Sequence, residues 1–151
     1  MSAVREATRS DTDAAGKLLA AQLEEHSLPA APQQIARGLE AVFAAGKATT
    51  LLIAEDEARP VGVCLANRIA SVEYGGTALF IEELFVLPQS RNRGVGRALL
   101  GYLLKAARAE GLQAVELEVE PGHEPARHLY RSLRFVQNAR TPLVLDLRKG
   151  S

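Results

Sequence analysis

One stretch of the sequence restricts the possible folds more than any other. The apolar run ALFIEELFVL, residues 78–87, leads through PQS into RNRGVG, residues 91–96, and then directly into a helical pattern. In that pattern Val95, Leu99 and Leu103 recur at intervals of four, which is typical of one buried helix face. The order strand, glycine turn, helix predicts an α/β fold. Because a helix N-terminus leaves about four N–H groups unpaired and carries about half a positive charge, the loop is also a candidate anion site.

Two common nucleotide-binding motifs do not fit this loop. The phosphate-binding pattern G-x-x-x-x-G-K-[ST] occurs nowhere in the chain. A dinucleotide fingerprint G-x-G-x-x-G/A that starts at Gly94 would place bulky Leu99 where a helix and a strand must approach closely. The remaining interpretation is R/Q-x-x-G-x-G/A, filled by Arg91 to Gly96 directly after the apolar strand. Two glycines among three arginines favour a bound anion over a plain surface turn.

The rest of the chain supplies the other elements of an α/β domain. Strict alternation in AVELEVE indicates a strand with one solvated face, and the turn-like DEARP between two apolar runs indicates a hairpin. No repeat or linker interrupts the chain, so we expect one domain over residues 1–151 with mixed strand order. Helices are predicted near residues 10–26, 32–46, 95–110 and 124–133, and strands near residue 4, at 49–55, 60–71, 78–87 and 114–120, with two closing strands within 135–147.

Composition narrows the possible partners and the compartment. Of 151 residues, 47% are hydrophobic and 24% are charged, and the formal net charge is zero. A neutral chain has no overall field that would recruit nucleic acid or an anionic membrane, so we expect neither as a partner. The only cysteine, Cys64, lies in an apolar run and excludes a disulfide framework. We therefore expect a cytoplasmic protein with no metal site.

Several segments together resemble the GNAT superfamily of N-acetyltransferases. FIEELFVLPQSRNRGVG resembles that family's fourth strand and acetyl-CoA loop, and HEPARHLYRSLRF resembles its closing N-x-x-A-x-x-L-Y-x-x-x-G-F motif. VREATRSD and LLIAEDEARPVGVCLA resemble its opening strand and its second and third strands. The resemblance implies a mixed, mostly antiparallel central sheet of about seven strands flanked by about four helices. Within the superfamily, IEELFV and HEPARHLY look most like the diamine and thialysine acetyltransferase branch.

The resemblance also implies where acetyl-CoA, the acetyl donor, would bind. Backbone amides of the loop would cradle its pyrophosphate, and the fourth strand would lie alongside it and donate N–H groups to the thioester carbonyl. His123 stands where the family commonly has Asn, and Arg134 stands where it usually has Gly. The implied cofactor-binding residues are Leu84, Phe85, Val86, Arg91, Asn92, Arg93, Gly94, Val95, Gly96, Arg97, His123 and Tyr130.

Acetyl transfer to an amine needs a proton acceptor for the amine and a proton donor for the departing sulfur. The resemblance assigns the donor role to Tyr130. For the acceptor role Glu82 is favoured, directly or through a water, because the resembling branch has an acidic residue there. Glu82 and Glu83 are adjacent in a strand, so we expect their side chains to point to opposite faces. At most one of them then faces the acceptor directly, and Glu83 is the solvated or ion-paired neighbour counted with the substrate-binding residues.

The first helix ends with Glu24, Glu25 and His26, in a region that lines the acceptor cleft of this family. Together with Glu82 and Glu118 they would make the acceptor side acidic, which suits a small cationic amine such as a polyamine or a lysine-like molecule. Two alternatives stay open at this point: acetylation of peptides or proteins, and a coenzyme A-binding regulatory module without turnover. Dimers are common in the family, so a homodimer is possible.

Overall fold

The coordinates are a computed structural model that describes residues 2–148; Met1 and residues 149–151, the ends of the predicted domain, lie outside the described residues. Backbone contacts divide the chain into two compact units, Met1–Glu118 and Val119–Ser151. Each unit is described by itself. Among residues 2–148 no helix has the length and apolar character that crossing a bilayer requires.

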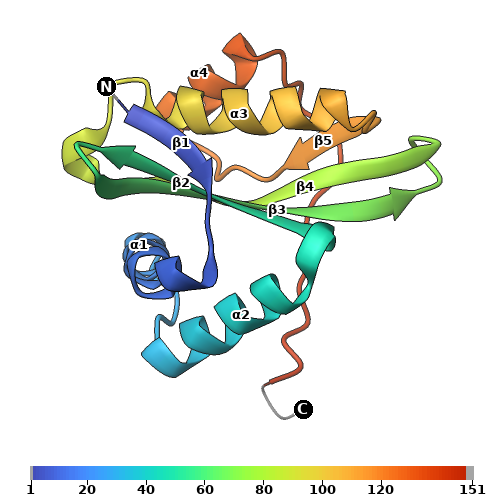
Figure 1. The fold of residues 1–151 in the computed structure, drawn as a ribbon. Helices are drawn as coiled ribbons and strands as arrows, with labels where there is room; N and C mark the ends of the chain where they lie inside the picture. Colours follow the sequence, from blue (N-terminus) through green and yellow to red (C-terminus); the bar gives the residue numbers. More distant parts are fainter. Residues whose placement is uncertain (1, 149–151) are drawn as a thin grey trace. The chain divides into compact units, whose positions relative to one another are not determined.

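The first unit is built on a five-stranded sheet with the order β1-β2-β3-β4-β5. The pairs β1·β2, β2·β3 and β3·β4 are antiparallel, whereas β4 and β5 run parallel (Figure 1). This arrangement confirms the mixed, mostly antiparallel sheet that the sequence predicts. The strands are β1 (Ser2–Glu6), β2 (Thr49–Asp56), β3 (Arg59–Ser71), β4 (Gly76–Val86) and β5 (Ala114–Leu117).

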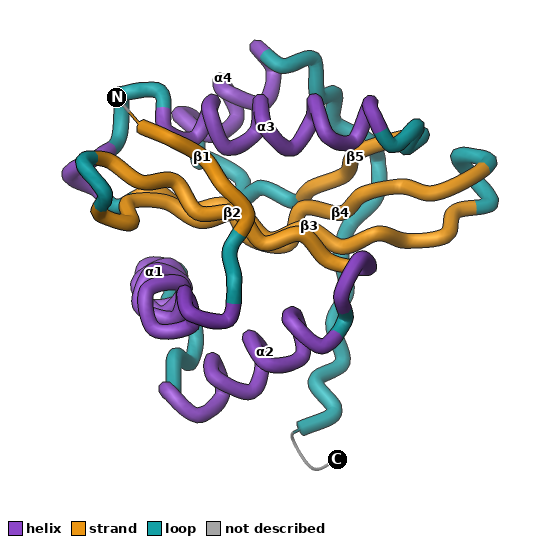
Figure 2. The backbone as a smooth tube through the Cα atoms, in the orientation of Figure 1, coloured by secondary structure: helices purple, strands orange, loops and turns teal. Residues whose placement is uncertain are grey.

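Helices cover both faces of this sheet. Helices α1 (Thr12–Glu25) and α2 (Pro32–Ala44) lie on one face, and α3 (Val95–Ala109) lies on the other (Figure 2). Short 3₁₀ turns at Arg9–Asp11, Gly46–Ala48 and Pro88–Ser90 connect them to the strands. Because both faces are covered, four consecutive residues of β2, 51–54, are all buried.

Two hydrophobic layers result from this covering. On the α1/α2 side, Leu18, Leu39, Ile53, Val63 and Phe85 belong to one buried cluster. Helix α3 packs against β1 to β4 and buries Leu99, Leu100 and Leu103 on the other side. Strand β4 is therefore packed against α1 on one face and against α3 on the other.

The second unit contains one helix, α4 (Glu124–Ser132), which brings the described α-helices to the predicted four. The two closing strands predicted within 135–147 are wrong, because this segment has no strand in the structure. The sheet therefore has five described strands and not about seven. The apolar pattern of the segment is real, but a strand also needs a neighbour that supplies hydrogen-bond partners. Here Leu143, Val144, Leu145 and Leu147 are each at least 84% exposed.

Candidate active site

The loop between β4 and α3 has the backbone shape of an anion site. Gly94, the residue before α3, has φ 82°, a left-handed conformation that favours glycine, and Asn92 has φ 62°. A Cβ on Gly94 would meet nothing within 4 Å, so the backbone angle and not space accounts for glycine here. The first N–H donor within the helix is that of Ala98, which bonds to the Gly94 carbonyl. The amides of Val95 and Gly96 precede it and point out of the helix start.

Gly62 of β3 fixes how closely α3 approaches the sheet. A Cβ at this position would lie 3.1 Å from Leu99 Cδ1, 3.2 Å from Val95 Cγ1 and 3.2 Å from the Phe85 carbonyl oxygen. A residue with a Cβ would have to push the start of α3 or strand β4 away by a few tenths of an ångström. The loop is thereby held against β4. A glycine inside an apolar strand pattern is a sequence signal for close backbone approach, and the sequence analysis missed it.

The arginines of the loop have different surroundings. The Arg91 guanidinium lies 2.6 Å from Glu25 Oε2, donates to the Val86 carbonyl at 2.9 Å and stacks over the Phe85 ring at 5.5 Å. Within residues 2–148 no hydrogen bond or ion pair is recorded for the Arg93 side chain, which is exposed beside a 130 Å³ hollow. Arg91 thus ties the loop to the end of α1, whereas Arg93 is available to an anion.

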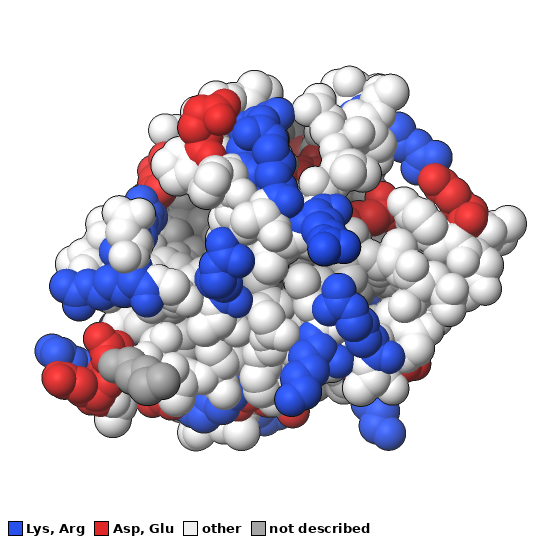
Figure 3. All heavy atoms as spheres, turned by 90° about the horizontal axis from the view of Figure 1, so that it is seen from above, with Lys and Arg blue, Asp and Glu red and all other residues white. Residues whose placement is uncertain are grey.

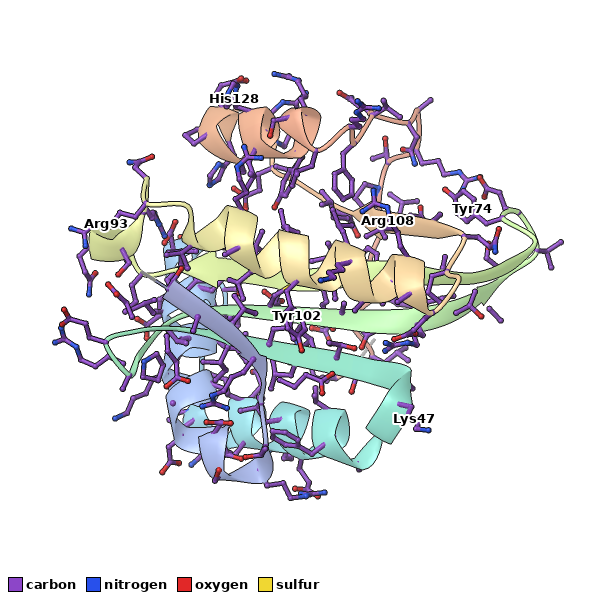
Figure 4. The ribbon with its side chains drawn as sticks, turned by 45° about the horizontal axis from the view of Figure 1, so that its top comes forward. Lys47, Tyr74, Arg93, Tyr102, Arg108 and His128 are labelled. Carbon is purple, nitrogen blue, oxygen red and sulfur yellow. The ribbon has the colours of Figure 1, made fainter. Side chains whose placement is uncertain are left out.

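Several Lys and Arg side chains are exposed on the side of the molecule that carries α3, the side from which Figure 3 is drawn. Arg93 lies in the loop before α3 and Arg108 near the helix's far end, with Tyr102 between them (Figure 4). The basic residues that the loop and α3 contribute to this side are Arg93, Arg97, Lys105 and Arg108.

A β-bulge in β4 changes where its two carboxylates lie. Leu65 of β3 pairs with Glu83, but the next residue, Ala66, pairs with Ile81, so Glu82 is an extra residue in β4. As a result Glu82 and Glu83 both line one cavity. The expectation that they point to opposite faces is therefore wrong, because it assumed a regular strand. A bulge depends on the pairing register, which the local sequence does not reveal.

The cavity that contains both carboxylates has a volume of about 440 Å³ and lies on the α1/α2 side of the sheet. Most of its lining is apolar, and Asn67 and Gln34 add amides. Asn67 Nδ2 donates to Glu82 Oε2 at 3.0 Å, which fixes the Glu82 side chain. The sequence analysis missed Asn67, although an amide in an otherwise apolar strand was a usable signal. The apolar lining residues are Leu19, Leu23, Ile35, Gly38, Leu39, Ala41, Val42 and Leu65.

Burial makes Glu83 an unusual carboxyl group. Desolvation, and to a smaller extent the negative charge of Glu82, raise its pKa to about 7, while the charge of His26 acts in the opposite direction. A carboxyl with this pKa can take up a proton at neutral pH, which an ordinary carboxylate does poorly. Cys64, in contrast, is inert, because burial raises the pKa of its thiol to about 12.

The five residues predicted for the acceptor side are only partly brought together. Glu82 and Glu83 line the cavity, and His26 acts on Glu83 through its charge. Glu25 is engaged by Arg91, and exposed Glu24 is not part of the cavity lining. In the described residues, no group of three or more His, Cys, Asp or Glu side chains is placed to hold a metal ion.

The edge of β4 opens just beyond the bulge. β4 pairs with β5 only from Ala78 to Ile81, and the last pair is Ile81 with Leu117. Beyond it, Leu84 and Val86 pair with β3 on one side and with no described strand on the other. The predicted cofactor-binding residues Leu84, Phe85 and Val86 therefore form a free strand edge that leads into the glycine loop.

The second unit contains His123, Tyr130 and Arg134. His123 caps α4, and its Nδ1 accepts a hydrogen bond from the Ala126 N–H at 3.3 Å, a task for which Asn is also suited. The Tyr130 and Phe135 rings meet edge to face at 5.8 Å. Arg134 has φ 72°, so it keeps the left-handed turn that usually requires glycine. The roles of His123 and Tyr130 toward acetyl-CoA stay predictions.

Comparison with protein families assigns the chain to one of them. The model of the acetyltransferase (GNAT) family matches residues 15–135. The chain therefore belongs to the acetyltransferase (GNAT) family, as its sequence motifs predict.

Two relatives are similar over parts of their length. The chain is 35% identical over 85 residues to an uncharacterized N-acetyltransferase of Methanocaldococcus jannaschii. The matched stretch covers 55% of this chain and 37% of that protein. The chain is also 37% identical over 68 residues to streptothricin acetyltransferase of Streptomyces lavendulae. This match covers 44% of this chain and 36% of that protein. The similarity thus spans just over a third of each relative's length.

Solved structures share the fold over almost the whole chain. A possible acetyltransferase from Clostridium difficile 630 superposes with a TM-score of 0.84 at 18% identity, covering 97% of this chain and 98% of that one. An integron cassette protein from the mobile metagenome of Cole Harbour Salt Marsh gives 0.84 at 22% identity, with 95% and 90% covered. A predicted acetyltransferase from Clostridium acetobutylicum, solved with acetyl-CoA, gives 0.80 at 19% identity, with 98% and 97% covered.

Proposed function

We propose that this protein is an acetyl-CoA-dependent N-acetyltransferase that transfers the acetyl group directly to a primary amine, within a single domain of residues 1–151. One observation carries the proposal: β4 presents a half-buried carboxyl to an apolar cavity and then continues as a free edge into the glycine loop. An acceptor site and a donor site are thus adjacent on one strand. Membership of the acetyltransferase (GNAT) family supports the same reaction.

The residues of the first unit fit acetyl-CoA, which would supply the acetyl thioester. The left-handed Gly94 and the amides at the start of α3 suit a pyrophosphate, with Arg93 as the exposed cation beside them. The free edge at Leu84 to Val86 offers N–H groups for the thioester carbonyl. The solved relative from Clostridium acetobutylicum that contains acetyl-CoA has the same fold.

The proposed mechanism assigns the proton transfers to Glu83 and Tyr130, with Glu82 as the partner of the acceptor's ammonium. Glu82, fixed by Asn67, attracts the ammonium of the acceptor, and Glu83 takes up its proton so that the amine nitrogen can attack the acetyl carbon. The sequence favours Glu82 for that second role, but burial raises the pKa of Glu83 to about 7, which suits a proton acceptor at neutral pH. The bond from carbon to sulfur breaks as the new bond to nitrogen forms. As the family resemblance implies, the Tyr130 hydroxyl gives its proton to the departing sulfur. The acylated nitrogen then releases its second proton to water, and the Tyr130 phenolate regains a proton from water.

The acceptor belongs to the class of small cationic amines, such as a polyamine or a lysine-like molecule. The paired carboxylates support this class, as does the sequence resemblance to the diamine and thialysine branch. The N-acetyltransferase and streptothricin acetyltransferase relatives match only in part, so they support N-acetylation in general. A cytoplasmic location and a homodimer belong to the same proposal.

A thiol-release assay tests the proposal. Acetyl-CoA is combined with polyamines, amino acids, aminoglycosides and short peptides, and the wild type is compared with Tyr130→Phe and Glu83→Gln. We expect turnover on one amine class and a loss of about 100-fold or more in kcat for each variant. Turnover on peptides alone would assign the peptide alternative. Tight binding of acetyl-CoA without release on any amine would leave a coenzyme A-binding regulatory module and would contradict the proposal.

A further inference from the structure

The charged side chains that line the 440 Å³ cavity all come from one part of its wall. Of its lining residues only Glu82 and Glu83 are charged, and both come from the bulge of β4. Helix α2 carries Arg37 and Glu40, but neither lines the cavity. The wall that faces the two carboxylates is therefore uncharged.

Most of the remaining wall is apolar and is made by both helices and β3, with Gln34, Thr49 and Asn67 as its uncharged polar residues. Leu19 and Leu23 of α1 contribute, together with Ile35, Leu39 and Val42 of α2. Leu39 also belongs to the buried core cluster, so this wall is continuous with the hydrophobic core. A ligand that enters the cavity exchanges water for hydrocarbon where it contacts this wall.

These walls discriminate among cationic amines. A polyamine has an ammonium group every few carbons, and each ammonium that leaves water without an acidic partner is strongly disfavoured. A single ammonium group can be met by Glu82 and Glu83, while each methylene that contacts the apolar wall adds about fourfold in affinity. The cavity thus favours amines with one charged end and penalises amines with two.

Building on the function proposed above, we infer that the acceptor is a primary amine with a single ammonium group on an apolar body. Its nitrogen lies at Glu82 and Glu83, and its hydrocarbon lies against Leu23, Ile35 and Val42. This narrows the class of small cationic amines to monoamines. Polyamines and lysine-like molecules, the examples that the sequence resemblance suggests, would then be poor acceptors.

Matched pairs of amines test this inference with the wild-type protein. The kcat/KM for acetyl transfer is measured for hexylamine, 6-aminohexan-1-ol and 1,6-diaminohexane, which have the same six-carbon chain. We expect hexylamine to exceed 1,6-diaminohexane by at least tenfold, with the amino alcohol in between. Among butylamine, pentylamine and hexylamine we expect a rise of about fourfold per methylene. A diamine that equals or exceeds hexylamine would overturn the inference.

Position 38 offers a variant that should weaken or remove the preference for the monoamine. Gly38 of α2 lines the cavity, and a Cβ built there meets nothing within 4 Å, so Gly38→Asp adds a carboxylate without a clash. It should raise the ratio of kcat/KM for 1,6-diaminohexane to that for hexylamine at least tenfold. Ala36→Asp adds the same charge to the same helix at an exposed position outside the cavity and should leave the ratio unchanged. Equal ratios in both variants would overturn the inference.

Two further measurements separate a failure of this inference from a failure of the proposed function. Calorimetric titration with acetyl-CoA alone shows whether the donor binds, and the total thiol release over all amines shows whether any transfer occurs. Transfer that favours diamines or lysine-like molecules would overturn the inference and leave the acetyltransferase intact. Donor binding without transfer to any amine would overturn the proposed function, and the inference would fall with it.

Discussion

At the residue scale, Glu83 shows how surroundings convert a common side chain into a reactive one. Its sequence neighbour Glu82 is chemically the same group, but it is exposed and held by Asn67. Glu83 is half-buried, and burial together with the charge of Glu82 raises its pKa to about 7. The sequence identified both carboxylates, but only the bulge and the burial distinguish them. Their roles therefore could not be separated before the pairing register was known.

Replacing Glu83 should stabilise the protein and impair its activity. The folded state retains the Glu83 proton from about pH 4.5 to about 7, where the unfolded chain releases it, so the free energy of unfolding falls as the pH rises through this window. Glu83→Gln has no ionisable group at this position, so its free energy of unfolding does not fall in this way as the pH rises. Its melting temperature should exceed that of the wild type at pH 8 and approach it at pH 4, as measured by calorimetry. A variant that is less stable at pH 8 would show that Glu83 makes a favourable ionised contact instead.

The activity of the wild type should depend on the same ionisation. Because Glu83 must be deprotonated to accept a proton, kcat/KM should rise with pH through about 7. Glu82→Gln removes a charge that raises the Glu83 pKa, so the midpoint of the rise should move to lower pH. A midpoint that is the same in wild type and Glu82→Gln would mean that another group controls the profile.

At Arg134 the sequence suggests a turn of different shape, but the structure keeps the left-handed turn. Arg134 stands where the family usually has glycine, and its φ of 72° costs a residue with a Cβ about 1 kcal/mol. Hydrogen bonds from the Phe135 N–H to the Tyr130 carbonyl and from the Arg134 N–H to the Arg131 carbonyl close the helix in a Schellman turn. The turn is thus kept despite the strain.

Arg134→Gly should therefore raise the free energy of unfolding by about 1 kcal/mol, measured by urea denaturation. Arg134→Ala is the matched control, because it removes the side chain but keeps the Cβ and its strain. Ser27→Gly tests the same effect at the end of α1, where Ser27 has φ 57°. A gain that is equal in the Gly and Ala variants would assign the effect to lost charge and not to the backbone.

At the scale of elements, local patterns predicted most of the first unit. The helices and the strands β2 to β4 follow from periodicity, and the loop follows from Gly94 and Gly96, because these signals are contained in neighbouring residues. The β4 bulge was missed because it depends on how two strands align. The close approach of α3 to Gly62 and the ion pair of Arg91 with Glu25 were missed for a similar reason. Each depends on a contact between residues far apart in the sequence.

The loop arginines should therefore differ in function. Arg93→Ala should raise the KM for acetyl-CoA about tenfold and weaken its dependence on salt, because Arg93 is the exposed cation beside the proposed phosphate site. Arg91→Ala should change this KM less and instead lower the free energy of unfolding by up to about 1 kcal/mol, because Arg91 pairs with Glu25. Steady-state kinetics at two salt concentrations and urea denaturation distinguish the two. A larger effect on KM from Arg91→Ala would reassign the phosphate contact.

At the scale of the whole molecule, the closing segment contains an apolar pattern that the described chain does not use. Leu143, Leu145 and Leu147 fall on one face of an extended chain, and Val144 and Asp146 fall on the other. Leaving three leucines in water forgoes roughly 1.5–3 kcal/mol for each side chain. A homodimer that buries the leucine face would recover this energy, and it belongs to the function proposed above.

If the leucine face forms that interface, sedimentation should detect a wild-type dimer that Leu143→Asp with Leu145→Asp converts to a monomer. Val144→Asp is the control, because it adds a carboxylate between these positions on the opposite face, one where the double variant adds two, and it should leave the dimer intact. Two buried carboxylates without partners would cost more than the leucines contribute, so the doubly substituted chain should stay monomeric as its concentration rises. A wild-type protein that is already monomeric at about 100 μM would contradict the homodimer, because an obligate apolar interface binds far more tightly than that.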